Sequence, residues 1–431
     1  MRSLYPLEIQ SRVINAEGYV AVMTIDVRRV REEEFDAWSD AIDVGFNTPH
    51  NRGDGPRRRR WFELDRCWGA FDGATPVGTL RAISLEATVP GGAFVPHAGI
   101  SAVTVAPTHR RRGLLSRMMA GELGAAKERG DILAGLYASE YPIYGRFGFG
   151  PATTCAKWHL DARAAAFARE LPGDVEVVDT EAAFKEAAPL YDRVRALTPG
   201  AVSRTRAMWE NKLDLVLREG EPAPKKCLHA LCRDESGEAV GFLRYKFGEE
   251  RWTHERPDNP VEVLDLFAIN VEYEARLWKY LADHDWVSEV VGRGGRREDE
   301  LWRELLVNRR VAWADNQSDA EWIRVLDTSA ALSARRYEVP GRVVLRVVDK
   351  DGYAAGTFAL EGGPDGATCG PSAESPDVTL PVAVLGSIYL GGFSAGRFGV
   401  LGMLDEHRNG AVARLSAMFQ TAIAPWCPVG Y

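Results

Sequence analysis

Two short stretches of the chain contain residue types that can perform chemistry. The first is a basic loop, 110–113, which separates an alternating apolar run (99–105) from a run with apolar residues at helical spacing (114–123). The second is YASEYPIYGRFGFGPA, 137–152, which contains five aromatic residues, three glycines and two prolines. The first stretch could bind a phosphate, and the second raises the question of whether one of its tyrosines takes part in a reaction.

The basic loop joins an expected strand to an expected helix. Pro107 ends the strand because proline cannot continue a hydrogen-bonded ladder. Free backbone N–H groups and the positive end of the dipole at a helix start favour an anion such as a pyrophosphate. Gly113 allows close backbone approach, and the three arginines before it raise the local potential. A solvated basic loop ahead of an ordinary amphipathic helix is the alternative.

Tyr144 is the central tyrosine of the aromatic stretch. Most tyrosines pack against their neighbours and satisfy their hydroxyl locally, so a packing role is the alternative to a chemical one. Tyr137 and Tyr141 are interpreted as packing or pocket residues. The chain ends in Tyr431, for which the alternative to a functional role is a frayed tail.

Length and composition describe a soluble globular protein. The 431 residues, 45% hydrophobic and 26% charged, predict two to four domains. No run approaches the roughly 20 apolar residues of a membrane span, and the first residues lack the apolar core of a secretory signal. We therefore expect a cytoplasmic protein without a membrane span. Residues 1–22 are interpreted as a flexible leader, with Met23 as an alternative start.

Charge and cysteine usage exclude several classes of function. A net charge of −8 argues against nucleic-acid binding and favours cationic small molecules. The arginine run 57–60 is expected to be a solvated loop. Six scattered cysteines are interpreted as reduced thiols, and Cys227 and Cys232 lack a second pair at the spacing of a metal site. No metal site is predicted.

The chain divides into three segments of mixed α+β character. The expected boundaries are 1–155, 156–320 and 321–431. Asp72-Gly73 and Asp351-Gly352 are typical of tight turns between strands. The apolar run WIRVLD, 322–327, is expected to open the third segment as a strand, and a compact α+β unit follows it.

The motifs resemble a known family. The pattern V-x-V-A-P-x-x-R-R-R-G-L-L, 103–115, is similar to the acetyl-CoA loop of GCN5-related N-acetyltransferases, called GNAT enzymes. The stretch ASEYPIYGRFGFGPAT, 138–153, resembles the enhanced intracellular survival (Eis) branch, and its segment 143–148 is the specific part. This resemblance implies a GNAT domain, a degenerate second GNAT-like domain, a sterol-carrier-like C-terminal domain and a homohexamer.

The resemblance also implies roles for individual residues, with acetyl-CoA as cosubstrate and no metal. Backbone groups of three strand residues would bind pantetheine, and six residues would cradle the pyrophosphate. Ser139 and Glu140 would line the cofactor near the thioester. Tyr144 would act as the general acid and the α-carboxylate of Tyr431 as the base. The strand residues are Val103, Thr104 and Val105, and the loop and helix residues are Arg111, Arg112, Gly113, Leu114, Leu115 and Ser116.

The second segment repeats the strand-to-helix pattern without its phosphate-binding features. FAINVEYEARLWKYLA, 267–282, has no glycine and no arginine cluster at the turn. Glu272 and Glu274 would repel a pyrophosphate there. We therefore expect one acetyl-CoA site per chain, in the first segment.

The nature of the amine acceptor is predicted from the resemblance alone. The resemblance implies amines of bulky polycations such as aminoglycosides, with protein lysine side chains as an alternative. The residue before the last one is Gly430. An acidic residue at this position would attract a polyamine, and glycine does not. A different class of function is a lipid- or partner-binding protein with a vestigial acetyltransferase fold.

Overall fold

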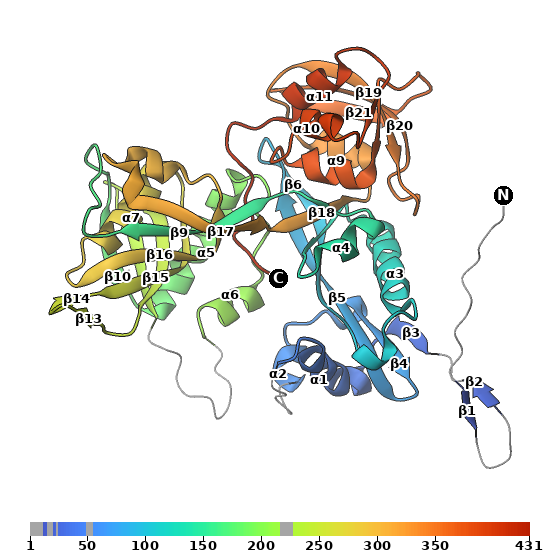
Figure 1. Cartoon of the computed structure of the whole chain (residues 1–431), viewed down its shortest axis with the longest axis horizontal. Coiled ribbons are helices and arrows are strands. Elements are labelled where there is room, and N and C mark those ends of the chain that lie inside the picture. Colours follow the sequence, from blue (N-terminus) through green and yellow to red (C-terminus); the bar gives the residue numbers. More distant parts are fainter. Residues whose placement is uncertain (1–11, 15–19, 23–24, 49–54, 216–226) are drawn as a thin grey trace.

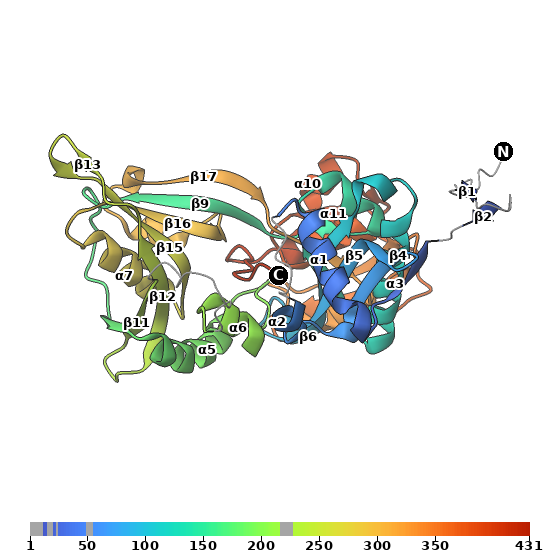
Figure 2. The same cartoon turned by 90° about the horizontal axis from the view of Figure 1, so that it is seen from below.

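Three domains, each built on one large sheet, make up the protein (Figure 1). The computed structural model describes residues 12–14, 20–22, 25–48, 55–215 and 227–431. Most of the suggested leader, and Met23, lie outside the described residues. The second domain lies at one end of the molecule, and the first and third domains lie together at the other end (Figure 2). Among the described helices, none is long and apolar enough to cross a bilayer.

The first domain is a seven-stranded sheet in the order β3-β4-β5-β6-β7-β18-β8. Its one parallel pair is β6 with β7, joined by the crossover helix α3. The short pair β1 (Arg12–Ile14) and β2 (Val20–Val22) precedes it. Its strands are β3 (Asp26–Arg29), β4 (Cys67–Asp72), β5 (Thr75–Thr88), β6 (Phe94–Val105), β7 (Leu133–Tyr137), β8 (Gly150–Pro151) and β18 (Glu321–Val325). Its helices are α1 (Phe35–Gly45), α2 (Gly55–Arg59), α3 (Leu114–Arg129) and α4 (Tyr141–Tyr144).

The second domain repeats this plan with a sheet in the order β10-β11-β12-β15-β16-β9-β17. Its parallel pair is β15 with β16, joined by α7. The large strands are β9 (Thr154–Asp161), β10 (Asp174–Val178), β11 (Leu228–Arg233), β12 (Ala239–Phe247), β15 (Asn259–Ala268), β16 (Val287–Arg297) and β17 (Ala312–Asp319). A small hairpin, β13 (Trp252–Thr253) with β14 (Arg256–Pro257), and helices α5 (Thr180–Ala196), α6 (Arg206–Lys212) and α7 (Val271–Ala282) complete it.

The third domain is a five-stranded sheet in the order β21-β20-β19-β22-β23 with four helices. Its strands are β19 (Gly341–Val348), β20 (Gly356–Gly363), β21 (Gly366–Pro371), β22 (Val378–Pro381) and β23 (Asp405–Glu406). Its helices are α8 (Thr328–Ala334), α9 (Val382–Tyr389), α10 (Ala395–Val400) and α11 (Ala411–Phe419). The expected α+β class is confirmed in all three domains.

Different helices pack on the two faces of the first sheet. Because side chains alternate along a strand, β6 sends Ala98 and Ile100 to the face that α3 covers. Met118 and Met119 of α3 are fully buried against that face. Helix α1 packs on part of the opposite face through Phe35, Trp38 and Ile42. On another part of that opposite face, His97 and Gly99 of β6 contact the C-terminal residue Tyr431.

Two expectations from the sequence need correction here. Strand β18, which was expected to open the third segment, pairs with β7 and β8 and belongs to the first sheet. The arginine run is not a solvated loop, since 57–59 lie in α2. Arg58 donates to Asp43 at 2.7 Å, and Arg59 donates to Glu32 at 2.7 Å. Acidic residues near α1 therefore hold this run in place.

Candidate active site

A fork between β6 and β7 lies at the centre of the first sheet. The two strands pair in parallel only over three positions, and Gly99 with Gly135 is the last of them. Beyond this point β6 continues to Val105, paired with β5 alone. The edge of β6 that faces the fork therefore offers strand backbone groups without a strand partner. Such an edge can bind an extended, peptide-like molecule as if it were another strand.

The predicted pantetheine residues lie on this open part of β6. Val103 and Val105 are half-buried, and Thr104 is buried with its hydroxyl 2.7 Å from that of Thr79. Ala102 has φ of 51° at a break in the β5–β6 register, and its carbonyl accepts the Thr79 hydroxyl. This bulge bends the strand away from β7, which opens the fork.

The predicted pyrophosphate loop lies directly before α3. Arg111 and Gly113 both have positive φ, 63° and 74°, so the chain turns sharply into the helix. Gly113 is the N-cap residue and offers no side chain to the helix start. A Cβ atom on Gly113 would meet nothing within 4 Å, so the surface over the first turn is open. Of the predicted set, Arg111, Gly113 and Ser116 are exposed, Arg112 and Leu115 are half-buried, and Leu114 is buried in the core.

The aromatic stretch forms a tight turn at the end of β7. Ser139 and Glu140 are exposed, and Glu140 is the N-cap of the short helix α4. Tyr144, the last residue of α4, is 8% exposed and packs edge-on against Phe149 with ring centroids 6.4 Å apart. Gly148, with φ of 81°, then returns the chain toward the sheet.

Tyr144 carries a hydroxyl without a hydrogen-bond partner among the described residues. Its ring belongs to the core cluster on the α3 face of the sheet. Burial raises the pKa of Tyr144 above its ordinary value, and the charge of Glu140 raises it further. The phenol is therefore protonated at neutral pH and free to donate to a bound molecule.

Tyr431 approaches the fork from the opposite face. Its ring lies against the glycine pair at the fork, since a Cβ atom on Gly99 would come within 3.0 Å of the ring. Its hydroxyl donates to Glu321 at 2.7 Å and lies 3.1 Å from Nε2 of His97. The chain end is thus held in the protein and is not frayed.

The other two tyrosines of the stretch make hydrogen bonds within the protein. Tyr137 donates to the carbonyl of Cys427 at 3.2 Å and packs edge-on against Tyr431 at 5.4 Å. The hydroxyl of Tyr141 accepts from the backbone N–H of Asp319 at 2.9 Å. Tyr137 therefore helps hold the tail, and Tyr141 fixes α4 to the end of β17.

His97 and Glu321 lie at the candidate site, although the sequence did not single them out. Both side chains are fully buried, and they lie 3.3 Å apart. They are 224 positions apart in the chain, and neither belongs to a recognisable motif. Only the pairing of β7 with β18 brings Glu321 to the fork.

In the second domain, side chains fill the positions that correspond to the start of α3 and to the open fork of the first domain. The side chain of Asn270 caps α7 by accepting from two backbone N–H groups, those of Glu272 and Tyr273, each at 3.0 Å. Arg296 of β16 donates to the carbonyl of Leu266, past the end of the parallel β15–β16 pairing. The guanidinium of Arg296, 3% exposed, occupies the space where the first domain has an open fork.

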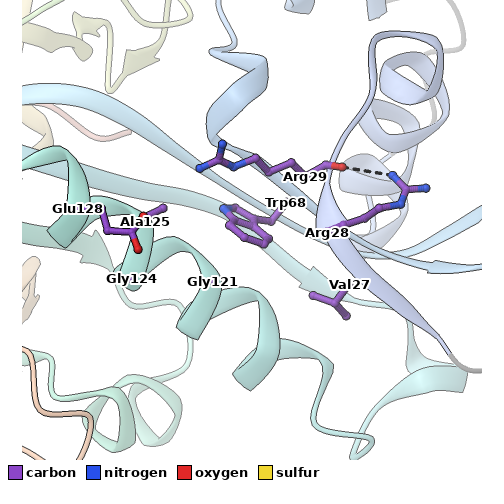
Figure 3. A pocket seen from close by; sticks show the side chains of 8 residues that line it. All are labelled: Val27, Arg28, Arg29, Trp68, Gly121, Gly124, Ala125 and Glu128. Carbon is purple, nitrogen blue, oxygen red and sulfur yellow. Dashed lines mark hydrogen bonds between the residues drawn. The ribbon is translucent and has the colours of Figure 1, made fainter.

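A pocket of about 590 Å³ lies elsewhere on the first domain, between β3, β4 and the middle of α3 (Figure 3). Trp68 forms its floor, with Arg29 and Glu128 at its sides. None of the predicted site residues lines it. Arg28 at its edge is already paired with Glu34 at 2.7 Å. Among the described residues, no group of His, Cys, Asp and Glu side chains is arranged to hold a metal ion.

Family models match each of the three domains. An acetyltransferase (GNAT) domain model matches residues 26–152, and a second GNAT domain model matches residues 200–355. A sterol carrier protein domain model matches residues 328–428. Two GNAT domains followed by a sterol-carrier-like domain are the architecture expected from the sequence, and this expectation is confirmed.

Similar proteins align over most of the chain. An N-acetyltransferase of Streptomyces avermitilis is 39% identical over 94% of this chain and 98% of its own length. The N-acetyltransferase Eis of Mycobacterium tuberculosis is 33% identical over 82% of this chain and 86% of its own length. The crystal structure of Eis1 from Mycobacterium abscessus superposes with a TM-score of 0.83 at 28% identity, covering 95% of this chain and all of that one.

Proposed function

The chain belongs to the Eis family of GNAT N-acetyltransferases, and from this we propose that it transfers an acetyl group from acetyl-CoA to primary amines of aminoglycoside-like polyamines. The observation that carries the proposal is the contrast between its two GNAT domains. The first has an open strand fork and an uncapped helix start, and the second has both filled by its own side chains. One acetyl-CoA per chain follows from this contrast.

The first domain offers suitable groups to two parts of acetyl-CoA, its pantetheine arm and its pyrophosphate. The open edge of Val103, Thr104 and Val105 suits the amide groups of pantetheine. The start of α3 offers N–H groups, its dipole and two neighbouring arginines to the pyrophosphate. When bound there, acetyl-CoA supplies the activated acetyl group and a thiolate leaving group.

Tyr144 is proposed as the acid that protonates the leaving sulfur. An ordinary tyrosine, at pKa about 10, lies about 1.5 units above a thiol, so this proton transfer costs about 2 kcal/mol. Burial of Tyr144 raises its pKa and widens this gap. The transfer therefore depends on geometry, because a hydroxyl held at the sulfur can donate only as the carbon–sulfur bond breaks.

The α-carboxylate of Tyr431 is proposed as the base. A carboxylate at pKa about 3.5 is mismatched with an ammonium near 10 by about 9 kcal/mol. It therefore cannot deprotonate the resting acceptor efficiently. We assign it the tasks of orienting the amine, which solvent has already deprotonated, and of accepting a proton once attack makes the nitrogen acidic. The ring of Tyr431 lies on the face of the sheet opposite Tyr144, which suits these separate tasks.

A polyamine acceptor is supported by the net charge of −8 and by the side chain of the C-terminal residue Tyr431 at the fork. Protein lysine side chains remain the alternative amine acceptor. The sterol-carrier-like domain supports the second class of function, in which the protein binds a lipid and the acetyltransferase fold is vestigial. We further propose the homohexamer that the family resemblance implies, which analytical ultracentrifugation would test.

An acetyl-CoA assay that follows thiol release separates these functions. The purified chain is incubated with acetyl-CoA and a panel of aminoglycosides, simple diamines and a lysine peptide. Thiol release that depends on a polyamine supports the proposal, and release with the peptide alone would reassign the acceptor. Isothermal titration should give one acetyl-CoA per chain, and no binding at all would reject the enzyme.

A further inference from the structure

The last residues of the chain, 426–431, contact the second domain and then the first domain. After α11 the tail leaves the third domain and ends where the second domain meets the first (Figures 1 and 2). Trp426 donates its ring N–H to the carbonyl of Gly295 at 2.8 Å, and its backbone N–H to that of Pro199 at 2.8 Å. Its ring lies 4.8 Å from the guanidinium carbons of both Arg296 and Arg297. The arginine that fills the second fork thus also holds the tail.

The next contact is a buried ion pair of the second domain. Arg204 is bound by both carboxylate oxygens of Asp265, at 2.7 and 3.1 Å. It also donates to the carbonyl of Pro428 at 3.3 Å. A guanidinium fixed on one side by a carboxylate is a rigid donor on the other. The tail is therefore guided by the second domain before it reaches the first.

The tail ends in a socket of four residues at the fork, which we call the terminal socket: His97, Gly99, Gly135 and Glu321. The two glycines leave the space that the Tyr431 ring fills, because a Cβ atom on Gly135 would lie 2.6 Å from the Tyr431 hydroxyl. Glu321 and His97 then bind that hydroxyl at 2.7 and 3.1 Å. Burial raises the pKa of Tyr431 well above its usual value, and the neighbouring Glu321 adds to this shift. The hydroxyl is thus a permanent donor to Glu321.

We infer that His97 and Glu321 are positioning residues that place the terminal carboxylate at the acetyl-transfer centre by holding the side chain of Tyr431. The inference rests on the proposed function, in which that carboxylate is the base. Gly99 and Gly135 are the last paired residues before the strands diverge, so the socket fixes the chain end at the vertex of the fork. The degenerate second domain then has a role of its own, since Arg204 and Arg296 deliver the tail to this socket.

The test separates the position of the carboxylate from its presence. Tyr431→Phe keeps the ring and the carboxylate but removes the hydroxyl, and Glu321→Gln exchanges the carboxyl group for an amide, whose oxygen is a weaker acceptor. We expect kcat to fall about tenfold in Tyr431→Phe, which loses a buried hydrogen bond, and less in Glu321→Gln, whose amide oxygen still accepts from the hydroxyl. KM for acetyl-CoA should stay within about twofold in both. Tyr337→Phe is the matched control, since it removes a buried tyrosyl hydrogen bond of 2.8 Å in the third domain and should leave kcat unchanged.

A double-variant cycle distinguishes positioning from a general loss of structure. Appending one glycine after Tyr431 moves the carboxylate, and we expect kcat to fall about 100-fold in the otherwise unchanged chain. In the Tyr431→Phe background the same extension should cost about tenfold only, because the carboxylate is already displaced. Purely additive losses, with lower melting temperatures to match, would overturn the inference.

The failures of the two proposals look different in these measurements. If the extension leaves kcat unchanged, the carboxylate is not the base and the mechanism proposed for Tyr431 is wrong. If the extension lowers kcat but Tyr431→Phe and Glu321→Gln do not, the carboxylate acts without the socket and the present inference is wrong. If Glu321→Gln does not fold, Tyr431→Phe decides, since it leaves the buried Glu321 and His97 pair intact.

Discussion

Tyr144 combines burial on the α3 face with a hydroxyl that no described residue binds. That hydroxyl is not among the side-chain atoms that are closed off from solvent without a partner, so it is accessible to a bound molecule. We predict that Tyr144→Phe lowers kcat by about 10²–10⁴-fold, the usual contribution of general acid catalysis. KM for acetyl-CoA should change little, and equal losses in kcat and in acetyl-CoA affinity would indicate a packing role.

A second prediction concerns Glu140, which lies near Tyr144. Its charge contributes to the raised pKa of Tyr144, although burial contributes more. An acid with a raised pKa stays protonated to a higher pH, so Tyr144 should cause no loss of kcat below pH about 10. Glu140→Gln should move the alkaline limb of the kcat profile to lower pH. A shift in the opposite direction, or none, would mean that Glu140 does not act on Tyr144.

Helix α3 offers a prediction at the scale of the element, through the two glycines at its ends. Gly113 and Gly130 have φ of 74° and 86°, and a Cβ atom on either would meet nothing within 4 Å. Alanine at either position therefore costs backbone strain alone, about 1–2 kcal/mol. We predict that Gly113→Ala weakens acetyl-CoA binding about fivefold to tenfold, because the strained loop rearranges over the proposed pyrophosphate site.

Gly130→Ala is the matched control for this prediction. It carries the same backbone strain at the other end of the same helix, away from the basic loop. It should lower stability to a similar extent without changing acetyl-CoA affinity in isothermal titration. Equal losses of affinity in both variants would show that helix stability, and not the loop, controls binding.

The elements that local patterns specify could be predicted from the sequence. Apolar spacing after Gly113 placed α3, and the break at Pro107 placed the end of the strand region before it. The internal contrast between the two domains could also be anticipated, because Glu272 and Glu274 lie in the first turn of α7. The capping by Asn270 was not anticipated, although its place immediately before that helix is a typical capping signal.

Long-range pairing accounts for what could not be predicted. A five-residue apolar strand such as β18 fits the edge of many sheets, so its sequence does not reveal that it pairs with β7. The terminal socket depends on that pairing. In the sequence, His97 and Glu321 look like any other buried polar residue of a strand. Only the order of the strands in the sheet brings them to Tyr431. The tight turn around Tyr144 was recognised through a family motif and not through its physical pattern.

At the scale of the whole molecule, the third domain is joined to the turn that carries Tyr144 through Arg324. This fully buried side chain of β18 binds both oxygens of Asp349, at 2.9 and 3.0 Å. Its guanidinium lies under Gly148, directly after the Tyr144 turn. Removing one partner of a buried pair leaves the other charge poorly compensated, and Asp351, partly exposed and 3.6 Å from the guanidinium, would compensate Arg324 only in part. Asp349→Asn should therefore destabilise the protein by about 3–5 kcal/mol and lower the calorimetric melting temperature.

A surface pair supplies the comparison for Asp349→Asn. Arg342 and Glu374 form an exposed ion pair in the third domain. Exposed pairs of this kind contribute little to stability, so Glu374→Gln should leave the melting temperature unchanged. If Asp349→Asn behaves like Glu374→Gln, the buried pair does not join the third domain to the first.

Stability at high pH gives a second prediction for the whole molecule, because many of its ionisable groups are buried in the neutral form. Burial raises the pKa of Cys67 and of Cys369 to about 12, and that of Cys232 to about 11. It also raises the pKa values of six tyrosines: Tyr137, Tyr191, Tyr245, Tyr337, Tyr389 and Tyr431. In the unfolded chain, thiols ionise near pH 8.5 and tyrosines near pH 10.

The sign of the effect follows from proton binding. Above these unfolded pKa values the folded chain holds more protons than the unfolded chain, so stability falls as pH rises. Each such group lowers the free energy of unfolding by up to about 1.4 kcal/mol per pH unit, until its folded pKa is reached. Six tyrosines together remove about 8 kcal/mol per unit above pH 10, comparable with the total stability of a typical domain, about 5–15 kcal/mol. We therefore expect a gradual loss of stability from pH about 8.5 and cooperative unfolding within roughly one to two units above pH 10.

Tyrosinate absorbance at 295 nm and far-ultraviolet circular dichroism, recorded in one titration, test this expectation. The absorbance of the buried tyrosines should rise together with the loss of secondary structure. Tyr337→Phe removes one of the six groups, so above pH 10 the stability of the third domain should fall less steeply than in the unchanged chain, by up to about 1.4 kcal/mol per unit. If all tyrosines ionised at pH about 10 while the circular dichroism stayed unchanged, this result would contradict the burial of the tyrosines in the terminal socket and in the hydrophobic cores.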